Sequence, residues 1–243
     1  MKDTALPVFV AALLLIAGGL PSASHADESL LGYVKGAETL PKGSWELYQV
    51  ITRRTGKSEG HYDAWNLSTE VEHGITDRLT AKANLKFQSV DVEDLLVDGY
   101  LPKDESYGLR VSGAELAVKY MFLSPAISWM GLSGQFSLDY NWLDPHSGQD
   151  KDTVSAESML ILQKYFLEGQ LVWMNNFGLE TTYAERDRIN NLPPGFEWPT
   201  DPEMEIELKY GMGLSYRFAP RWFLDGHPKP AMHGHLKTGH RRA

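Results

Sequence analysis

The sequence predicts an all-β fold, an antiparallel up-and-down transmembrane β-barrel in which about eight strands are recognisable. Three observations lead to this prediction. Segments of 11 to 15 residues alternate apolar and polar side chains, as strands with two unlike faces do. The connections between them alternate in length, and their apolar faces end in aromatic residues. Both properties are typical of outer-membrane barrels.

The first three expected strands differ in how regularly they alternate. "SWELYQVITRR" (44–54) alternates imperfectly, whereas "DAWNLSTEVEHG" (63–74) sets Trp65 and Leu67 against polar and acidic neighbours. "LTAKANLKFQS" (79–89) places apolar side chains on the odd positions and Thr, Lys, Asn and Gln on the even positions. The second and third segments therefore have one apolar and one polar face.

The next three expected strands continue this pattern. "GLRVSGAELAVKYMF" (108–122) alternates well from Ala114 to Tyr120, and "LSGQFSLDYNW" (132–142) sets apolar even positions against polar odd positions. "TVSAESMLILQK" (153–164) is less regular. No helical period competes over a comparable length, so we assign all three to strands.

The last expected strands are the clearest. "GQLVWMNNFGLETTY" (169–183) precedes "MEIELKYGMGLSYRF" (204–218), whose even positions are apolar and whose odd positions are charged or small. "RWFL" (221–224) begins a candidate ninth strand. Each full segment is long enough to cross a bilayer, which takes about 9–11 residues in a tilted strand.

The connections fall into two groups. The tight turns alternate with long, acidic, Pro/Gly-rich loops. The long connections comprise residues 55–62, 90–107, 143–152 and 184–203. Outer-membrane barrels have short periplasmic turns and longer outside loops. With a periplasmic N-terminus, we therefore expect these four loops to lie outside the cell.

The composition excludes several classes of protein. There are no cysteines, so disulfides, thiolate metal sites and a cysteine nucleophile are absent. The formal net charge is −9, to which residues 221–243 contribute +4, so the preceding residues carry −13. An acidic barrel segment is a poor match to nucleic acid, which needs a basic surface.

The N-terminus has the pattern of a secretory signal peptide. "ALPVFVAALLLIAGGL" (5–20) is an apolar core, and "SHA" offers small residues for cleavage after Ala26. A membrane anchor is the alternative, but the apolar run is shorter than the ~20 residues a spanning helix needs. We assign 1–26 to the signal peptide and 27–43 to an N-terminal periplasmic segment before a barrel over 44–224.

The apolar faces could point inward, as in a soluble lipocalin-like barrel, or outward into lipid. We favour lipid, because the aromatic residues form two girdles and the polar faces carry charges of both signs. The residues expected to face the lumen are Glu70, Glu72, Lys82, Lys86, Glu115, Lys119, Asp139, Glu157, Glu180, Glu205, Glu207, Lys209 and Arg217. The expected interfacial aromatic residues are Trp65, Phe87, Tyr120, Phe122, Tyr140, Trp142, Tyr183, Tyr216 and Phe218.

The inward charges allow two interpretations. They can form a salt-bridge network that fills a narrow barrel, since eight strands leave room for little but side chains. They can also line a lumen that selects solutes. We favour the filled interior for an eight-stranded closure, and the lumen gains weight if further strands exist.

Residues that could carry chemistry are few. "LDPHSGQD" (143–150) holds Asp144, His146 and Ser147, but members of a catalytic triad normally converge from separated positions. We therefore predict no catalytic residue and no enzyme activity. His73 is expected to be an ordinary residue at a strand end.

Metal and cofactor sites are likewise not predicted. The acidic loop at 90–107 is expected to be solvated, with cation-mediated contact to lipopolysaccharide phosphates as the alternative. The tail contains four histidines that could bind metal adventitiously, His227, His233, His235 and His240. Neither set has the spacing of a defined metal site, so we predict no metal and no cofactor.

Three stretches resemble an uncharacterised family of Gram-negative outer-membrane barrel proteins of unknown function. They are "LLGYVKGAETLPKGSWEL" (30–47), "STEVEHGITDRLTAKANLKF" (68–87) and "GLSYRFAPRWFL" (213–224). "TLPKGSWE" is the more particular motif, whereas "GITDRL" is common among outer-membrane barrels. The resemblance covers about residues 30–224. It implies the fold and the compartment, and it brings no catalytic motif.

We expect an exported protein of the cell outer membrane, with outer-membrane lipid and lipopolysaccharide as its surroundings. Its expected role is structural or that of a narrow solute pathway. An outer-membrane enzyme acting on lipid and a soluble periplasmic binding barrel are the alternatives.

The C-terminal residues 225–243 conflict with a complete barrel. They form a basic, His-rich tail, whereas the resemblance implies further strands after "RWFL". One explanation is closure by eight strands with a disordered tail. The other, which we favour, is a shift of reading frame near Leu224. We expect no regular membrane strand in this tail and an incomplete seam between the first and last strands.

Overall fold

The computed structural model describes residues 34–57, 60–95, 104–190, 192, 194–220 and 222–226, together with the backbone of 234–237. The expected signal peptide lies outside the described residues, as do residues 227–233 and 238–243. Among the described residues, no helix is long and apolar enough to cross a membrane. The helical element found in the described part of the chain is a 3-10 turn, Leu167–Gly169.

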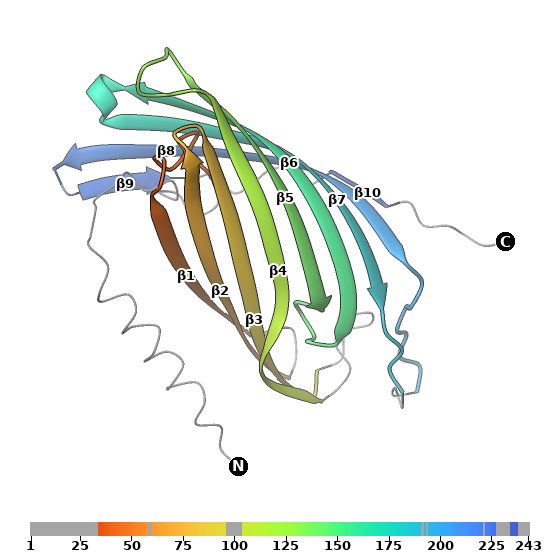
Figure 1. The fold of residues 1–243 in the computed structure, drawn as a ribbon. Coiled ribbons are helices and arrows are strands. Elements are labelled where there is room, and N and C mark those ends of the chain that lie inside the picture. Colours follow the sequence, from red (N-terminus) through yellow and green to blue (C-terminus); the bar gives the residue numbers. More distant parts are fainter. Residues whose placement is uncertain are drawn as a thin grey trace.

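One antiparallel sheet makes up the fold (Figure 1). Its first eight strands are β1 (Trp45–Thr55), β2 (His61–Thr76), β3 (Leu79–Glu93), β4 (Glu105–Leu123), β5 (Gly131–Leu143), β6 (Asp150–Phe166), β7 (Leu171–Arg186) and β8 (Glu203–Ala219). Each pairs with the next along the chain, so the predicted all-β, up-and-down order is confirmed. All eight expected segments coincide with these strands.

The end of the chain adds two short strands to the edge of β8. β9 (Trp222–Gly226) pairs with β8 from Leu214 to Ala219, and β10 (Gly234–Lys237) pairs with β8 from Glu205 to Leu208. β9 confirms the candidate ninth strand. The expectation for 225–243 is that no regular membrane strand forms there, and in the described residues of this tail the structure adds only the end of β9 and the four residues of β10. Four residues span only ~13 Å, less than a crossing requires.

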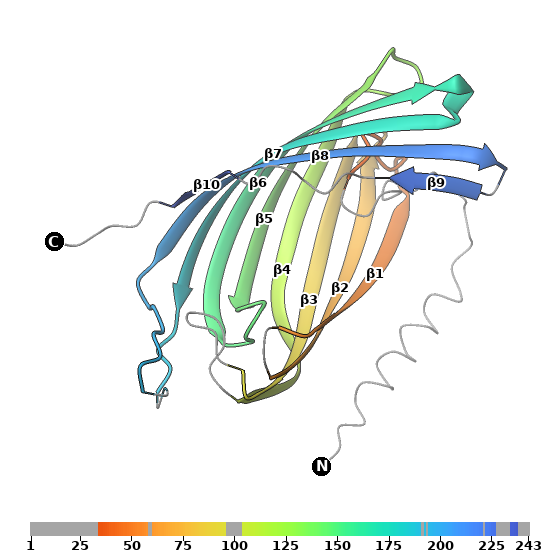
Figure 2. The ribbon, with the colours of Figure 1, turned by 180° about the vertical axis from the view of Figure 1, so that it is seen from behind.

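The sheet is not closed into a barrel. Among the described residues β1 pairs with β2 alone, and the far edge of β8 carries only β9 and β10. Figure 2 shows the resulting curved, open sheet from behind. The predicted incomplete seam between the first and last strands is therefore confirmed, whereas the predicted closed barrel is not.

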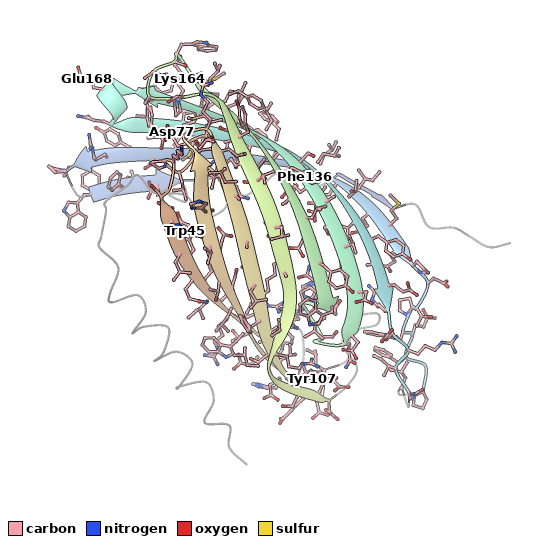
Figure 3. The ribbon with its side chains drawn as sticks, viewed as in Figure 1. Trp45, Asp77, Tyr107, Phe136, Lys164 and Glu168 are labelled. Carbon is pink, nitrogen blue, oxygen red and sulfur yellow. The ribbon has the colours of Figure 1, made fainter. Side chains whose placement is uncertain are left out.

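The antiparallel order gives the sheet two distinct ends. We call the end with the tight connections the turn end and the end with residues 56–60, 94–104, 144–149 and 187–202 the loop end. In Figure 3, Lys164 and Glu168 mark the turn end and Tyr107 marks the loop end. The predicted sorting of short and long connections is therefore only partial, because residues 124–130 at the turn end form a longer connection than residues 56–60 or 144–149 at the loop end.

The polarity of the two faces of the sheet is the reverse of that in a soluble protein, with polar side chains inside and apolar side chains outside. On the inner face polar side chains are buried, and Ser133 is 0% exposed. On the outer face large apolar side chains are exposed, with Leu116 at 66% and Leu208 at 63%. The apolar positions of the alternating sequence therefore point outward.

The expected aromatic residues follow the outer face. Seven of the nine are exposed, namely Trp65, Tyr120, Phe122, Tyr140, Tyr183, Tyr216 and Phe218, and Phe87 and Trp142 are half-buried. Tyr120 and Phe122 form an edge-to-face pair at 5.2 Å near the turn end. Lys164 lies 5.2 Å from the ring of Trp129 at the same end. A cation beside exposed rings suits a boundary between apolar and polar surroundings.

Candidate functional site: the charged inner face

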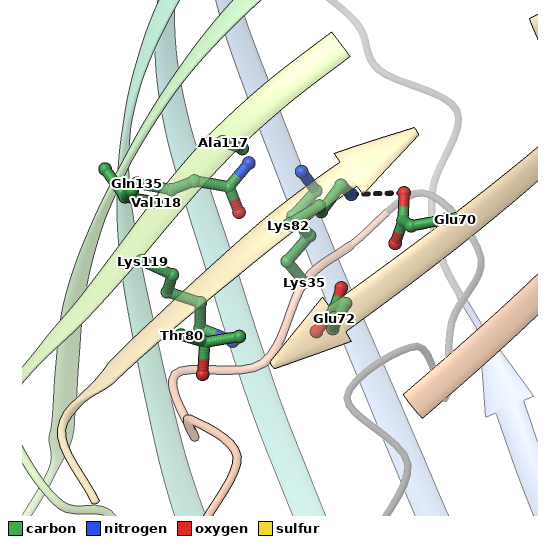
Figure 4. Close-up of a pocket in the computed structure, with 9 residues that line it drawn as sticks. All are labelled: Lys35, Glu70, Glu72, Thr80, Lys82, Ala117, Val118, Lys119 and Gln135. Carbon is green, nitrogen blue, oxygen red and sulfur yellow. Dashed lines mark ion pairs between the residues drawn. The ribbon is translucent and has the colours of Figure 1, made fainter. Parts of the chain in front are cut away.

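The inner face carries a set of ion pairs between strands. Near the turn end, Lys82 Nζ on β3 lies 2.6 Å from Glu70 Oε2 on β2 (Figure 4). Strand parity places both side chains on the inner face, as predicted. Glu72 and Lys119 line the same pocket and are buried. Charges of both signs thus fill this part of the interior.

A second ion pair reaches across an intervening strand. Lys86 on β3 pairs with Asp139 on β5, and its Nζ lies 3.4 Å from Asn141 Oδ1. Between them on β4 stands Gly113, which pairs with Lys86 on one side and Asn141 on the other. A Cβ at this position would collide with the Asn141 side chain. The glycine therefore makes room for the lysine to pass over β4.

A second lysine passes over a glycine in the same way, nearer the β8 edge of the sheet. Lys209 on β8 pairs with Glu180 on β7, and its Nζ lies 3.4 Å from Glu157 Oε1 on β6. Gly178 on β7 lies between, and a Cβ there would come within 3.2 Å of Glu157 Oε1 and of Lys209 Cβ. A glycine inside a strand often marks such a close approach.

Lys209 lies beside a row of three negatively charged glutamates. Glu157, Glu180 and Glu207 stand side by side on β6, β7 and β8. Like charges directly opposite each other destabilise a sheet. Because Lys209 contacts two of the three carboxylates, it offsets a repulsion that the register of the strands imposes.

The turn end of the interior holds a segment from the N-terminus. Residues 34–40 lie against the inner face, and Val34, Ala37 and Leu40 are buried. Val34 packs against Val172 and Met174 of β7. Sequence reasoning assigned this stretch only to a segment before the barrel. It shows no period, so nothing local indicated its place inside the sheet.

The loop end is covered by the connection 144–149, which we call the lid. Asp144 Oδ1 accepts hydrogen bonds from the backbone N–H groups of His146 and Ser147, both at 2.9 Å. Gln88 on β3 donates to the Asp144 carbonyl at 2.8 Å, and Tyr62 on β2 donates to that of His146 at 3.0 Å. Contacts with strands so far along the sheet show that the lid bends across the interior.

Asp144, His146 and Ser147 of the lid do not form the hydrogen-bonded chain of a catalytic triad. Ser147 Oγ donates to Asp144 Oδ1 at 3.1 Å and is fully buried. His146 Nδ1 instead lies 2.9 Å from Lys57 Nζ and 3.3 Å from Arg54 Nη1. Burial, and then the charges of Lys57 and Arg54, lower the pKa of His146. A neutral imidazole between two cations is held there as an acceptor.

Space inside the sheet is distributed unevenly. A cavity of about 330 Å³ lies below the lid. Its polar lining comprises Asn66, Ser68, Lys86, Gln88, Lys151 and Thr153. Beside residues 34–40 the free volume shrinks to about 30 Å³, around Lys35 and Lys82. The interior is therefore open in its middle and filled at the turn end.

Strand parity places the predicted lumen residues, Arg217 included, on the inner face. Arg217 is exposed, because it lies one residue past the last β7–β8 pair, Leu171 with Tyr216. The other residues of the prediction are buried or half-buried. Sequence reasoning missed the roles of Asn176 and Gln163. It also missed the roles of Gly113 and Gly178, although a glycine inside a predicted strand was an available signal.

Acidic and histidine side chains elsewhere form no defined cation site. Asp91 Oδ2 lies 3.7 Å from His61 Nε2, and Asp104 accepts from the Asp94 backbone at 2.8 Å. In the part of the chain that the structure describes, no three His, Cys, Asp or Glu side chains are grouped as metal ligands would be. The side chains of the four tail histidines lie outside this part.

Comparison with known proteins gives one match. The model of a family of unknown function, DUF6662, matches residues 23–227, a range that includes β1–β9. No curated protein matches the chain. No solved structure matches it either.

Proposed function

Since the chain belongs to DUF6662, a family of unknown function, we propose from its own geometry that it is an outer-membrane β-barrel protein with a narrow, charged solute pathway. The inversion of the two faces carries the proposal. Apolar side chains cover the outside of the sheet, and ion pairs and hydroxyls occupy much of the inside, together with one small apolar cluster toward each end. This is the arrangement that a bilayer favours and that water opposes.

The exposed apolar surface supports a lipid environment. Monomeric soluble proteins rarely expose contiguous apolar patches beyond a few hundred Å². Here large apolar residues are exposed along β4, β5, β7 and β8, with aromatic residues toward both ends. In this proposal outer-membrane lipid and lipopolysaccharide contact the outer face, and the N-terminal signal peptide directs export.

The membrane assignment also demands closure of the sheet. Hydrocarbon leaves no partner for an unpaired strand edge, so β1 and β8 must each pair in the membrane. After an even number of strands the two edge strands run antiparallel, which permits direct pairing of β1 with β8. The tail strand β10 occupies part of the edge that such pairing would use.

The polar interior supports passage of small hydrophilic solutes. The cavity below the lid is lined by amides, hydroxyls and two lysines, and also by the apolar residues Leu67, Phe87, Leu143 and Pro145. The two lysines and the amides offer hydrogen bonds to water and anions, which supports the passage of small hydrophilic solutes. A purely structural barrel is the alternative, and conductance separates the two, because a protein with no pathway carries no current in a planar bilayer.

An arginine scan tests the membrane assignment. Leu116 lies in the middle of β4, and Ile127, 84% exposed, lies in the turn between β4 and β5. On a lipid-facing midplane position, L116R should cost about 2–4 kcal/mol, whereas the control I127R near the interface should cost at most about 1 kcal/mol. In water both changes would be nearly neutral, since both side chains are exposed.

Cell fractionation provides the second measurement. The protein should appear in the outer-membrane fraction and require detergent for release. Equal unfolding free energies for L116R and I127R, together with recovery from the periplasm without detergent, would refute the membrane assignment.

A further inference from the structure

The segment at residues 34–40 is held by the sheet in an unusual way. It belongs to no strand, and its backbone groups bond side chains of the strands, while Thr39 Oγ1 donates at 2.9 Å to the Asp77 carbonyl in the β2–β3 turn, outside the strand ladders. The backbone groups of the sheet remain paired in their own ladders. The segment can therefore leave without unpairing the strands.

The clamps act on the backbone of the segment. Asn176 on β7 accepts from the Lys35 N–H at 2.7 Å and donates to the Lys35 carbonyl at 2.9 Å. Gln163 on β6 accepts from the Ala37 N–H at 2.6 Å, and Ser133 on β5 donates to the Ala37 carbonyl. An amide side chain that bonds the N–H and the C=O of the same residue recognises an extended backbone rather than a particular side chain.

Further contacts continue the groove at both ends. Thr80 on β3 accepts from the Leu40 N–H at 2.9 Å. Tyr165 OH on β6 donates to the Glu38 carboxylate at 2.7 Å. The Lys35 side chain lines the pocket beside Lys82, with Glu70 beyond it (Figure 4). Contacts from β3, β5, β6 and β7 thus follow the segment across the interior.

We propose that the inner face at the turn end is a binding groove for an extended peptide, and that residues 34–40 are its resident ligand, whose departure opens the interior. The groove itself stands on the contacts above, and only the opening rests on the proposed solute pathway. Each clamp is a polar side chain that water can satisfy, so release exchanges hydrogen bonds instead of losing them. When residues 34–40 leave, the space that they occupied is added to the free volume beside them. The turn end of the interior then becomes a passage.

A single cysteine reports whether the segment leaves. The chain has no cysteine, so the A37C variant carries one thiol, at a position that is 0% exposed. Only a released segment presents this thiol to a maleimide reagent. In detergent solution we expect labelling of A37C to be slow, and to become faster by about tenfold or more when N176A removes the double clamp.

The neighbouring asparagine provides a matched control. Asn175 lies on the same strand but faces the other way, where Tyr210 OH donates to it at 2.8 Å. N175A therefore removes a similar side chain without touching the segment. Equal labelling rates for A37C, A37C/N176A and A37C/N175A would overturn the proposal.

A peptide tests the groove directly. A variant lacking residues 34–40 should bind a synthetic peptide of the sequence VKGAETL in detergent, and N176A in this variant should weaken binding by about tenfold. Failure of the folded deletion variant to bind the peptide would overturn the groove. If the deletion variant does not fold, the labelling rates decide.

The planar bilayer then separates the two proposals. A current that rises on deletion and falls again on adding the peptide supports both. Saturable peptide binding with no current in any variant retains the groove and refutes the pathway. A current that the deletion leaves unchanged, with no peptide binding, retains the pathway and refutes the groove.

Discussion

Replacing Lys209 with methionine should destabilise the sheet more than its position near an open edge suggests. Methionine keeps the aliphatic length of the side chain and removes its charge. Glu157, Glu180 and Glu207 would then stand side by side without the cation that contacts two of them. The free energy of unfolding therefore falls by the energy of the lost ion pairs plus the repulsion between the glutamates that Lys209 had offset.

The exposure of the three groups sets the magnitude. The side chain of Lys209 is 35% exposed, and those of Glu157 and Glu180 are 18% and 19% exposed. Breaking a fully buried pair costs about 3–5 kcal/mol, whereas an exposed pair is worth about 0.2–1 kcal/mol. A partly exposed triad lies between these limits, so we expect K209M to lower the free energy of unfolding by about 1–3 kcal/mol.

Urea unfolding in detergent micelles measures this difference. R217M is the matched control, because Arg217 lies on the same strand and is exposed. We expect R217M to change stability by less than about 0.5 kcal/mol, as surface substitutions usually do. The double variant K209M/E180Q should recover part of the loss, because removal of one carboxylate relieves the repulsion.

Two results would contradict this reasoning. If K209M and R217M shift the unfolding midpoint equally, the cation does not stabilise the row of glutamates. If K209M/E180Q is less stable than K209M, the carboxylates do not repel one another, and the hydrogen bonds of Glu180 must be what matters.

Three further predictions follow from the lid, the crossing glycine and the loop end. Burial and nearby cations lower the pKa of His146 in the folded state, so protonation of the imidazole favours the unfolded lid. The stabilisation of the lid by neutral His146 is complete above about pH 6.5, the pKa of the unfolded state, and it is lost as the pH falls through the lowered pKa of the folded state. Hydrogen exchange of residues 144–149, corrected for intrinsic rates, should therefore accelerate from pH 7.5 to 5 in the parent, and an equal acceleration in H146Q would exclude the imidazole. G113V should displace Asn141 and the Lys86–Asp139 pair and cost about 1–3 kcal/mol in urea unfolding, as overpacking does, whereas G226A at the end of β9, where a Cβ meets nothing within 4 Å, should cost less. An epitope inserted at Gly195 should be reached by antibody on intact cells, and labelling only after permeabilisation would invert the predicted topology.

The strands were predictable because their signal is local. Period-two alternation over 204–218 fixes both the strand and the parity of its faces, and β8 follows it closely. The inward position of Lys82 and Glu70 follows from parity alone, because a one-residue slip would reverse every side chain. Which strand pairs with which also follows from the short turns.

The rest depends on contacts between residues far apart in sequence. Residues 34–40 have no period, and their place is set by Thr80, Ser133, Gln163 and Asn176 on separate strands. The sequence "DPHSG" signalled a turn through Asp and Pro, but its inward bend depends on Gln88 and Tyr62. The incomplete seam was expected because the tail lacks alternation, whereas the pairing of residues 234–237 with β8 was not expected.

The two lysines that cross over a glycine bear on the curvature of the sheet. Lys86 joins β3 to β5, and Lys209 joins β8 to β6, so each ties strands that are not neighbours. A tie along the inner side shortens the chord between alternate strands and makes the sheet curl more tightly. The degree of curl sets how many strands complete a circle, and hence the diameter of the ring. Substitution of a bulkier residue at Gly113 or Gly178 would flatten the arc, and a flatter arc would need more strands to meet itself.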